Sequence, residues 1–420
     1  MDYKKIVEKN YNLHILKTDK FKTIMVKVNF KRKIKKEEIS LRNMLVNVLF
    51  ESTKKYQTKR LMEIQTEELY ELGYRGTNYA SGIYSVIGFD NIFIDPKYTE
   101  KAMLKKSFEF LREILFNPDV DENGFSENSF NIGHKILEDH LISLNENPDL
   151  YSQIRVMEEL DPNHVFSYRN CGYAEILETI TRKSLYEYYL DVLKNDIVDI
   201  FVVGNVDEEE IKTIVKELFL FENRNQKGDD HFSKSLLKRD KVNLCIENNE
   251  LSQSKLVLGF KIDDTSDFEL RYVLNVLNYI LGGSPDSKLF QNVREKNSLC
   301  YTVSSSSQPL YSLLTIKAGI NASDYDRACA IILEQVEDLK KGNFTEEDVK
   351  KAKITYENSI NELKDNAESL ISLYAGIEYL NSDTIEKRIK LIKKVKKADI
   401  IKLANCLVLD TIFFLEGGGK

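Results

Sequence analysis

Hydrophobic and polar residues alternate with two different periods along this chain. Near the N-terminus, Leu13–Leu16 and Thr23–Phe30 alternate every second residue and contain β-branched side chains, which predicts strands. Ile39–Phe50 then places apolar residues on one side at helical spacing. Further helices are predicted at 58–72, 99–115 and from 126 to about 144, with a strand region after the Gly73–Gly76 turn and a break at Asn117-Pro118.

The same order of elements recurs after about residue 240. Strand patterns at 242–246 and 255–260 precede a helix near Phe268, whose LRYVLNVLNYIL resembles LRNMLVNVLF from Leu41. Leu41 and Leu270 are 229 residues apart, and the breaks at Asn117 and Gly342 are 225 residues apart. The chain therefore reads as two copies of one α+β module, since this period is far too long for a solenoid.

A hydrophilic run separates the two copies. Residues 222–240 (ENRNQKGDDHFSKSLLKRD) are rich in charged and polar side chains, as is typical of a linker. We therefore predict an N-terminal domain at 1–222, a linker at 223–240 and a C-terminal domain at 241–420.

Composition narrows the class of protein. The chain has 420 residues, is 42% hydrophobic and 30% charged, and carries a net charge of −7, which is typical of a globular protein without an excess of positive charge for nucleic acid. The sequence contains no run of 18 apolar residues, so no membrane span is predicted. The five cysteines are an odd number without a CxxC pair, and the N-terminus lacks an uninterrupted apolar signal region, so we expect a reducing, cytoplasmic location.

The most informative segment runs from Leu281 to Tyr301, LGGSPDSKLFQNVREKNSLCY. It reads as a helix that ends at a double glycine, a polar turn, a short helix and a tyrosine that opens a strand. The whole string resembles the second-half signature of the pitrilysin/insulinase metallopeptidases, LxGG–S–S–LFxxxREKxxLxY.

Other segments resemble the same family in the same order. Leu49–Tyr56 is similar to its LFxGTxxY stretch, Asn78 lies where the family has an Asn that opens its substrate-edge strand, and Phe201–Asp207 looks like the strand that closes its first domain. The resemblance implies two homologous α+β domains in a clamshell. Each would be an antiparallel-rich mixed sheet with helices mainly on one face.

The zinc motif of that family is missing. The family places HxxEH on the helix before LFxGT, where two histidines bind zinc and the glutamate is the general base. Alignment on Leu49-Phe50 puts Asn43, Val46 and Asn47 at these positions, and the family's third ligand falls at or near Glu138–His140. Because these asparagines have no imidazole and the valine cannot accept a proton, we expect no metal, no cofactor and no catalysis by the chain alone.

Two other candidates for chemistry come from the residues themselves. His134, Glu138 and His140 are spaced HxxxExH, which puts His140 about 240° around a helix from His134 at ~100° per residue, so the ligands do not converge. Cys300 would need a neighbouring base to act as a nucleophile and is more typical of a packed residue. A self-sufficient hydrolase is therefore the weakest of the alternatives.

Arg294 and Tyr301 remain as candidate substrate-binding residues. In the pitrilysin-like pattern this pair reaches the zinc site from the second domain and hydrogen-bonds the substrate carbonyl, a task that suits a guanidinium and a phenol. The alternative is a structural Arg–Glu pair with a packed tyrosine, and the sequence alone leaves both open.

The resemblance implies a function in a pair of chains. Bacterial and mitochondrial relatives associate as two chains, of which one carries HxxEH. The leading hypothesis is a zinc-less subunit that helps bind unfolded peptide and offers Arg294 and Tyr301 to an HxxEH-bearing partner. The alternative is a structural or protein-interaction scaffold with the same fold and no role in proteolysis.

Overall fold

A computed structural model describes residues 2–222 and 233–418. Grouped by their contacts, the described residues form two compact units. Unit 1 comprises those of Met1–Ser143, Arg169–Asp230 and Lys364–Leu380, and unit 2 those of Leu144–Tyr168, His231–Leu363 and Asn381–Lys420. Each unit is thus built from both halves of the chain.

Unit 1 is built on a six-stranded sheet in the order β1-β2-β8-β3-β5-β4. Only the β2–β8 pair is parallel, and the other neighbours are antiparallel. The strands are β1 (Asp2–Val7), β2 (Asn12–Lys17), β3 (Thr23–Lys33), β4 (Gly73–Ser81), β5 (Tyr84–Ile94) and β8 (Ile197–Gly204), with a separate β6 (Val120–Asp121) and β7 (Gly124–Phe125) hairpin. Its helices are α1 (Ile39–Leu49), α2 (Lys59–Glu68), α3 (Ala102–Phe116), α4 (Glu127–Glu146, whose last residues belong to unit 2), α6 (Ala174–Leu177), α7 (Arg182–Asn195), α8 (Glu208–Leu218) and α12 (Ala367–Leu380).

Unit 2 is built on a five-stranded sheet in the order β11-β12-β10-β13-β9, in which β9 and β13 alone are parallel. The strands are β9 (Asn243–Asn249), β10 (Ser254–Ile262), β11 (Cys300–Gln308), β12 (Leu313–Ile320) and β13 (Leu407–Gly417). Its helices are α5 (Pro148–Leu160), α9 (Leu274–Leu281), α10 (Tyr325–Lys341), α11 (Glu346–Glu362), α13 (Ile385–Ile392) and α14 (Lys397–Asn405), with the π-helical turns η4 (Glu269–Val273) and η5 (Phe290–Glu295).

The two sheets confirm the internal repeat. In order and direction, β2, β8, β3, β5 and β4 of unit 1 match β9, β13, β10, β12 and β11 of unit 2. The predicted helices at 99–115 and 126–144 are found as α3 and α4. Gly73 and Gly76, predicted as a turn, lie in β4 instead. A glycine is needed at position 76 because this edge strand passes so close to α1 that a Cβ there would lie 2.3 Å from Val46 Cγ1.

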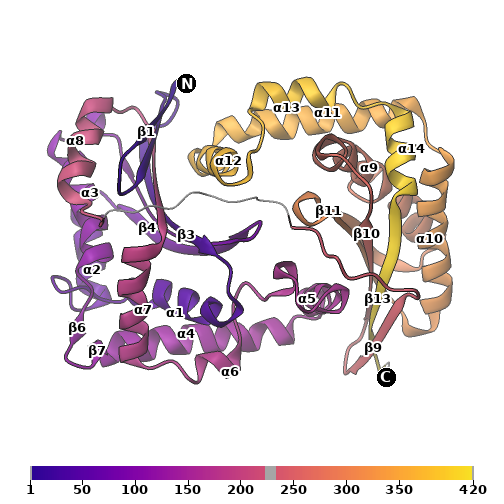
Figure 1. Ribbon diagram of the computed structural model, residues 1–420, viewed down its shortest axis with the longest axis horizontal. Coiled ribbons are helices and arrows are strands. Elements are labelled where there is room, and N and C mark those ends of the chain that lie inside the picture. The colour runs from indigo at the N-terminus through magenta and orange to yellow at the C-terminus, as the bar shows by residue number, and fades with distance from the viewer. Residues whose placement is uncertain (1, 223–232, 419–420) are drawn as a thin grey trace. The chain divides into compact units, whose positions relative to one another are not determined.

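On one face of each sheet lies a single helix that comes from the half of the chain that does not supply the sheet. In unit 1, α12 packs Leu370, Ile371 and Ala375 onto a sheet face that includes Phe201 and Val203. In unit 2, α5 packs Val156 onto a face made by Val257, Phe413 and Leu415. Figure 1 shows the magenta α5 beside β10 and β13, the late-sequence strands of unit 2. The remaining helices gather on the opposite faces, as predicted.

The predicted linker at 223–240 lies partly outside the described residues, which resume at 233. Residues 233–240 have no regular secondary structure and belong to unit 2. Ser235 donates to Asp161 at 2.6 Å, and Arg239 binds Asp410 at 2.6 Å. The described part of the predicted linker is therefore bound to the rest of unit 2 through these side chains.

Candidate functional site

The positions of the missing zinc motif lie on α1, where each side chain already has a partner. Val46 is 8% exposed and faces Gly76 of β4. The Asn43 amide donates to Ile39 O at 2.9 Å and to Asn170 O at 2.8 Å. The Asn47 amide donates to Gly133 O at 3.4 Å. The helix surface that would carry zinc ligands is therefore occupied by an apolar contact and by hydrogen bonds to backbone.

These residues do not fit zinc. Zinc in proteins is bound by imidazole, thiolate or carboxylate, and here two amide NH2 groups face backbone carbonyls as donors. Within residues 2–222 and 233–418, no three His, Cys, Asp or Glu side chains gather closely enough to hold a metal ion.

Residues 134–140 of α4 are engaged in local contacts. Lys135 binds both Glu138 and Asp139 at 2.9 Å, while His134 lies against the Phe130 ring at 6.2 Å between centroids. The contact of α4 with α1 is at Gly133, where a Cβ would lie 2.5 Å from Val48 Cγ2. This close approach explains a glycine in the middle of a long helix.

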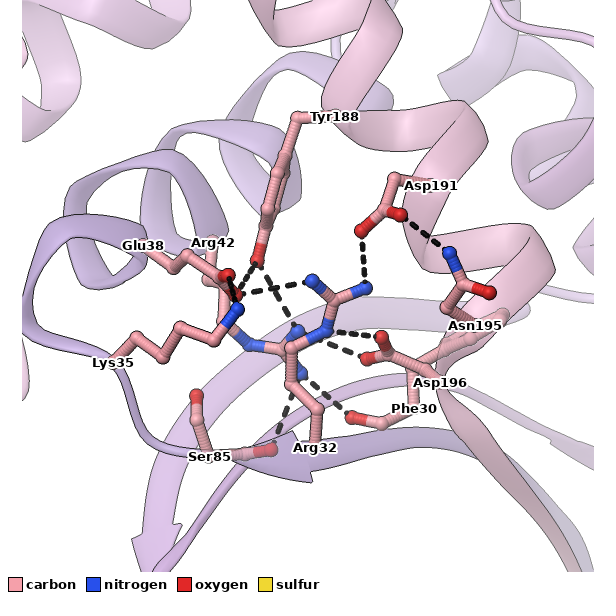
Figure 2. Close-up of polar contacts among 10 residues, drawn as sticks. All are labelled: Phe30, Arg32, Lys35, Glu38, Arg42, Ser85, Tyr188, Asp191, Asn195 and Asp196. Carbon is pink, nitrogen blue, oxygen red and sulfur yellow. Dashed lines mark hydrogen bonds and ion pairs between the residues drawn. The ribbon is translucent and has the colours of Figure 1, made fainter. Parts of the chain in front are cut away.

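A buried arginine cluster, which no motif in the sequence indicates, fixes α1 against the sheet (Figure 2). Arg42 of α1 is 1% exposed and donates to Asp196 Oδ2 at 2.9 Å, to Phe30 O at 2.8 Å and to Ser85 O at 3.2 Å. Arg32 of β3 binds the other oxygen of Asp196 and also Glu38 at 3.0 Å. The only sequence signal was that arginine is scarce, at 14 residues against 46 lysines.

The carboxylate of Glu38 is held ionised. Burial alone would raise the pKa of Glu38, but hydrogen bonds from Lys35, Arg32 and Tyr188 and the charge of Arg32 hold that pKa below its usual value. Three cations and three carboxylates meet here, so the charges balance without a ligand. The arrangement positions α1 and offers no open group for chemistry.

Asn78 lies near the end of β4, at the outer edge of the unit 1 sheet. The sequence placed it at the opening of a strand, whereas β4 begins at Gly73. Its amide approaches Asn170 O at 3.4 Å, the same carbonyl that Asn43 binds. Asn43 and Asn78 are therefore brought together around one backbone oxygen.

Arg294 and Tyr301 lie on either side of the short segment that joins η5 to β11 in unit 2. Arg294 belongs to η5, with its guanidinium 4.5 Å above the Phe290 ring and its Nε 3.6 Å from Glu295. Tyr301 is the second residue of the edge strand β11 and is 81% exposed. The structural alternative predicted an Arg–Glu pair and a packed tyrosine. The pair is present, but the tyrosine is not packed.

Gly282, the first glycine of the signature, holds the end of α9 close to β11. Ser305 of β11 donates its N–H to Gly282 O at 3.2 Å, and a Cβ on Gly282 would lie 2.6 Å from that nitrogen. Only glycine allows the helix end and β11 to approach this closely. The motif LGG thus connects α9 to the strand that carries Tyr301.

Cys300 is poorly suited to act as a nucleophile. Burial raises the pKa of its thiol to about 11, against a smaller lowering by the charge of Arg294. At neutral pH the thiol is therefore protonated, and the thiolate is the reactive form.

Comparisons with known proteins agree with this geometry. The family described as "Peptidase M16 inactive domain" matches residues 179–356. The chain is 28% identical over 409 residues to "Probable inactive metalloprotease YmfF" of Bacillus subtilis (strain 168), covering 96% of this chain and 95% of that protein. The chain is thus similar to inactive-type M16 peptidases. The resemblance to pitrilysin/insulinase-type peptidases is thereby confirmed.

Further comparisons support the same similarity and fold. It is 26% identical over 333 residues to "Uncharacterized zinc protease YmxG" of Bacillus subtilis (strain 168), covering 75% of this chain and 77% of that protein. A conserved protein from Enterococcus faecalis V583 superposes over 100% of both chains with a TM-score of 0.93 and 27% identity. A protease from Helicobacter pylori covers 99% of both chains with a TM-score of 0.80 at 17% identity. Among the helices of residues 2–222 and 233–418, none combines the length and the hydrophobicity that a membrane span requires.

Proposed function

We propose that this chain is the zinc-less subunit of a two-chain M16-type peptidase. It contributes Arg294 and Tyr301 to the zinc site of an HxxEH-bearing partner and helps to hold an unfolded peptide. We also infer that the pair works in the cytoplasm.

The observation that carries this proposal is the exposure of Tyr301. A tyrosine buries much apolar area when it packs, yet this one is 81% exposed and its phenol has no hydrogen-bond partner in the described part of the chain. The Arg294 side chain is also 41% exposed. The phenol, and the guanidinium N–H groups that Glu295 does not bind, are available to donate to an external carbonyl or oxyanion.

The contrast with α1 supports the same proposal. Asn43, Val46 and Asn47 are engaged within unit 1, so the chain cannot supply its own zinc. The donors for a substrate are retained while the metal ligands are replaced, as expected of a subunit that completes another chain's site.

Peptide binding is supported by an edge strand in each unit. Strands β4 and β11 each end a sheet. An edge strand offers unpaired N–H and C=O groups to an extended peptide, which adds to the sheet as a further strand. Unfolded peptide is the class of substrate that can adopt this conformation.

The test is reconstitution with an HxxEH-bearing M16 homologue from the same organism and a fluorogenic unstructured peptide. Arg294→Ala should lower kcat of the pair about 100-fold, because one transition-state donor is lost. Tyr301→Phe should have a smaller effect in the same direction. Lys296→Ala, which removes an exposed cation two residues away, is the matched control and should leave kcat unchanged.

Association of the two chains is measured in parallel by analytical ultracentrifugation. Arg294→Ala should leave association intact, which separates catalysis from assembly. If the chains associate but the mixture cleaves peptide no faster than the zinc-bearing chain alone, the scaffold function is favoured and the proposal is wrong.

A further inference from the structure

Comparison of the two repeats shows that β9 of unit 2 is exposed where the matching strand β2 of unit 1 is buried. In unit 1, Leu13 and Ile15 of β2 face the helix-bearing side of the sheet and are 1% and 3% exposed. The matching residues of β9 are Leu244 and Ile246, opposite Ile412 and Phe414 of β13. They are 52% and 50% exposed.

Two elements cover this end of the sheet in unit 1. Strand β1 pairs along the whole outer edge of β2. The segment after β8 also lies here, since Glu208 of α8 pairs with Lys4 of β1 and the Phe221 ring lies 6.2 Å from the Tyr11 ring. Neither a strand beside β9 nor a helix after β13 occurs among the described residues of unit 2.

The outer edge of β9 also lacks the usual protection. Asn249 O accepts the Gly418 N–H at 3.2 Å, so Asn249 and every second residue before it point their backbone groups toward β13. Val242, Leu244 and Ile246 therefore direct N–H and C=O groups outward. Natural edges are commonly protected by lysine, proline or a bulge, and none of these occurs in Asn243–Asn249.

The strand is complementary to itself in one antiparallel register. Centred on Leu244, this register places Val242 opposite Ile246 of the second strand and Leu244 opposite Leu244. It also places Lys241 opposite Glu247, so opposite charges meet at both ends. The residues that point their backbone groups outward form the hydrogen-bonded pairs, and each such pair exchanges two backbone bonds.

We propose that β9 pairs antiparallel with β9 of a second copy of this chain, about a twofold axis at Leu244. The two unit 2 sheets then form one continuous sheet, with Val242, Leu244 and Ile246 of both copies in a shared apolar strip. The interface is isologous, because the same strand serves both copies.

The elements beneath the sheet leave room for this pairing. Helix α5 packs on β10 and β13, so the two copies of α5 are separated by at least about three strand spacings, or about 14 Å. Packed helices need 8–10 Å between axes. Glu247 is held by Tyr151 at 2.7 Å and by Arg155 at 2.8 Å, and Lys241 of the second copy adds a further cation beside it.

The first test is the oligomeric state of the full chain by sedimentation equilibrium. The wild type should be a dimer, and Leu244→Lys should raise the dissociation constant about 100-fold, since two leucines are lost and two like charges meet on the axis. Ile354→Lys on α11, at a side chain 49% exposed, is the matched control and should leave the dimer unchanged. At protein concentrations below the dissociation constant of the wild type, thermal unfolding of both variants should match the wild type, because both side chains are half-exposed and dimerisation no longer raises the Tm.

The second test fixes the register. Asn243 and Cys245 of the second copy form a non-hydrogen-bonded pair, the kind whose side chains lie closest. Asn243→Cys should therefore give disulfide-linked dimers on mild oxidation, with a 243–245 peptide identified by mass spectrometry. Adding Cys245→Ser should abolish this link. A wild type that stays monomeric, or a dimer that Leu244→Lys does not weaken and that yields no such peptide, would overturn the proposal.

Discussion

The two sheets share one strand order, and each has one face covered by a helix from the other half of the chain, α12 in unit 1 and α5 in unit 2. The residues on that face differ between the two units. Beneath α5, unit 2 is apolar, and its buried charges are confined to one end, where Lys261 and Arg239 bind Asp410. Beneath α12, unit 1 mixes apolar residues with fully or nearly fully buried polar ones. These polar residues are His14, Lys27, Asn29, Lys31, Asp90 and Asp199.

The difference shows that topology does not dictate how an interior is filled. Apolar packing stabilises almost any close-fitting arrangement, whereas a buried polar group is stable only beside its partner. Asn29 donates to the Tyr379 phenol of α12 at 3.2 Å, and His14 pairs with Asp199 at 3.2 Å. Unit 1 is therefore specified by particular contacts, and unit 2 mainly by shape.

The largest expected effect comes from breaking a buried charge contact of unit 1. Asp196→Ala leaves Arg42 buried without its carboxylate and should cost about 3–5 kcal/mol of unfolding free energy. Asp191→Ala removes an exposed partner of Arg32 and should cost less than about 1 kcal/mol. Denaturant unfolding, with hydrogen exchange to locate the loss in α1, measures both. Equal costs for the two variants would contradict the role given to burial.

A smaller effect is expected from the apolar face of unit 2. Val257→Ala beneath α5 should cost about 2 kcal/mol, from lost transfer energy and the cavity left behind. Val408→Ala, on the same sheet but 50% exposed, should cost much less. Hydrogen exchange should place the loss in α5 and β10 and leave unit 1 protected. Loss of protection in unit 1 would mean that the units do not respond separately.

The smallest effect has the opposite sign. Burial lowers the pKa of Lys31, and the charges of Asp199 and Glu378 only partly oppose it, so the charged form is disfavoured on folding. Lys31→Met should raise Tm by about 2 °C at neutral pH. In contrast, Lys261→Met should lower Tm, since Asp410 then loses one cation.

This effect should depend on pH in a defined direction. Because the folded pKa of Lys31 lies below the unfolded value, its contribution to stability is complete only above the unfolded pKa and is lost as pH falls through the folded one. The advantage of Lys31→Met should therefore shrink as pH rises toward about 10.4. Calorimetric Tm values from neutral to alkaline pH check this, and a growing advantage would contradict the sign.

Much of the fold could be predicted from local pattern. Alternation predicted β3, helical spacing predicted α1 and α3, and similar strings at Leu41 and Leu270 predicted the repeat. Strand β1 was not found, because its DYKKIV sequence is mostly exposed and lacks a clear period. The exchange of α5 and α12 could not be predicted either, since periodicity shows that a helix has an apolar face but not which sheet it covers.

The candidate site was predictable only where a motif is continuous in sequence. The signature from Leu281 to Tyr301 spans η5 and the start of β11, so both donors were found together. The arginine cluster joins Arg32, Arg42 and Asp196, more than 150 residues apart at its extremes. No spacing rule connects such residues, because the chain that separates them can take many paths.

The position of α12 late in the sequence also determines when the unit 1 sheet can be covered during synthesis. When the ribosome has finished β8, the helix that will cover Leu16, Met25 and Phe201 is still roughly 160 residues from being made. At about 5–20 residues per second, the unit 1 sheet waits for about 8–30 seconds with one face bare. The nascent N-terminal half therefore exposes this apolar sheet face until its last helix has been made.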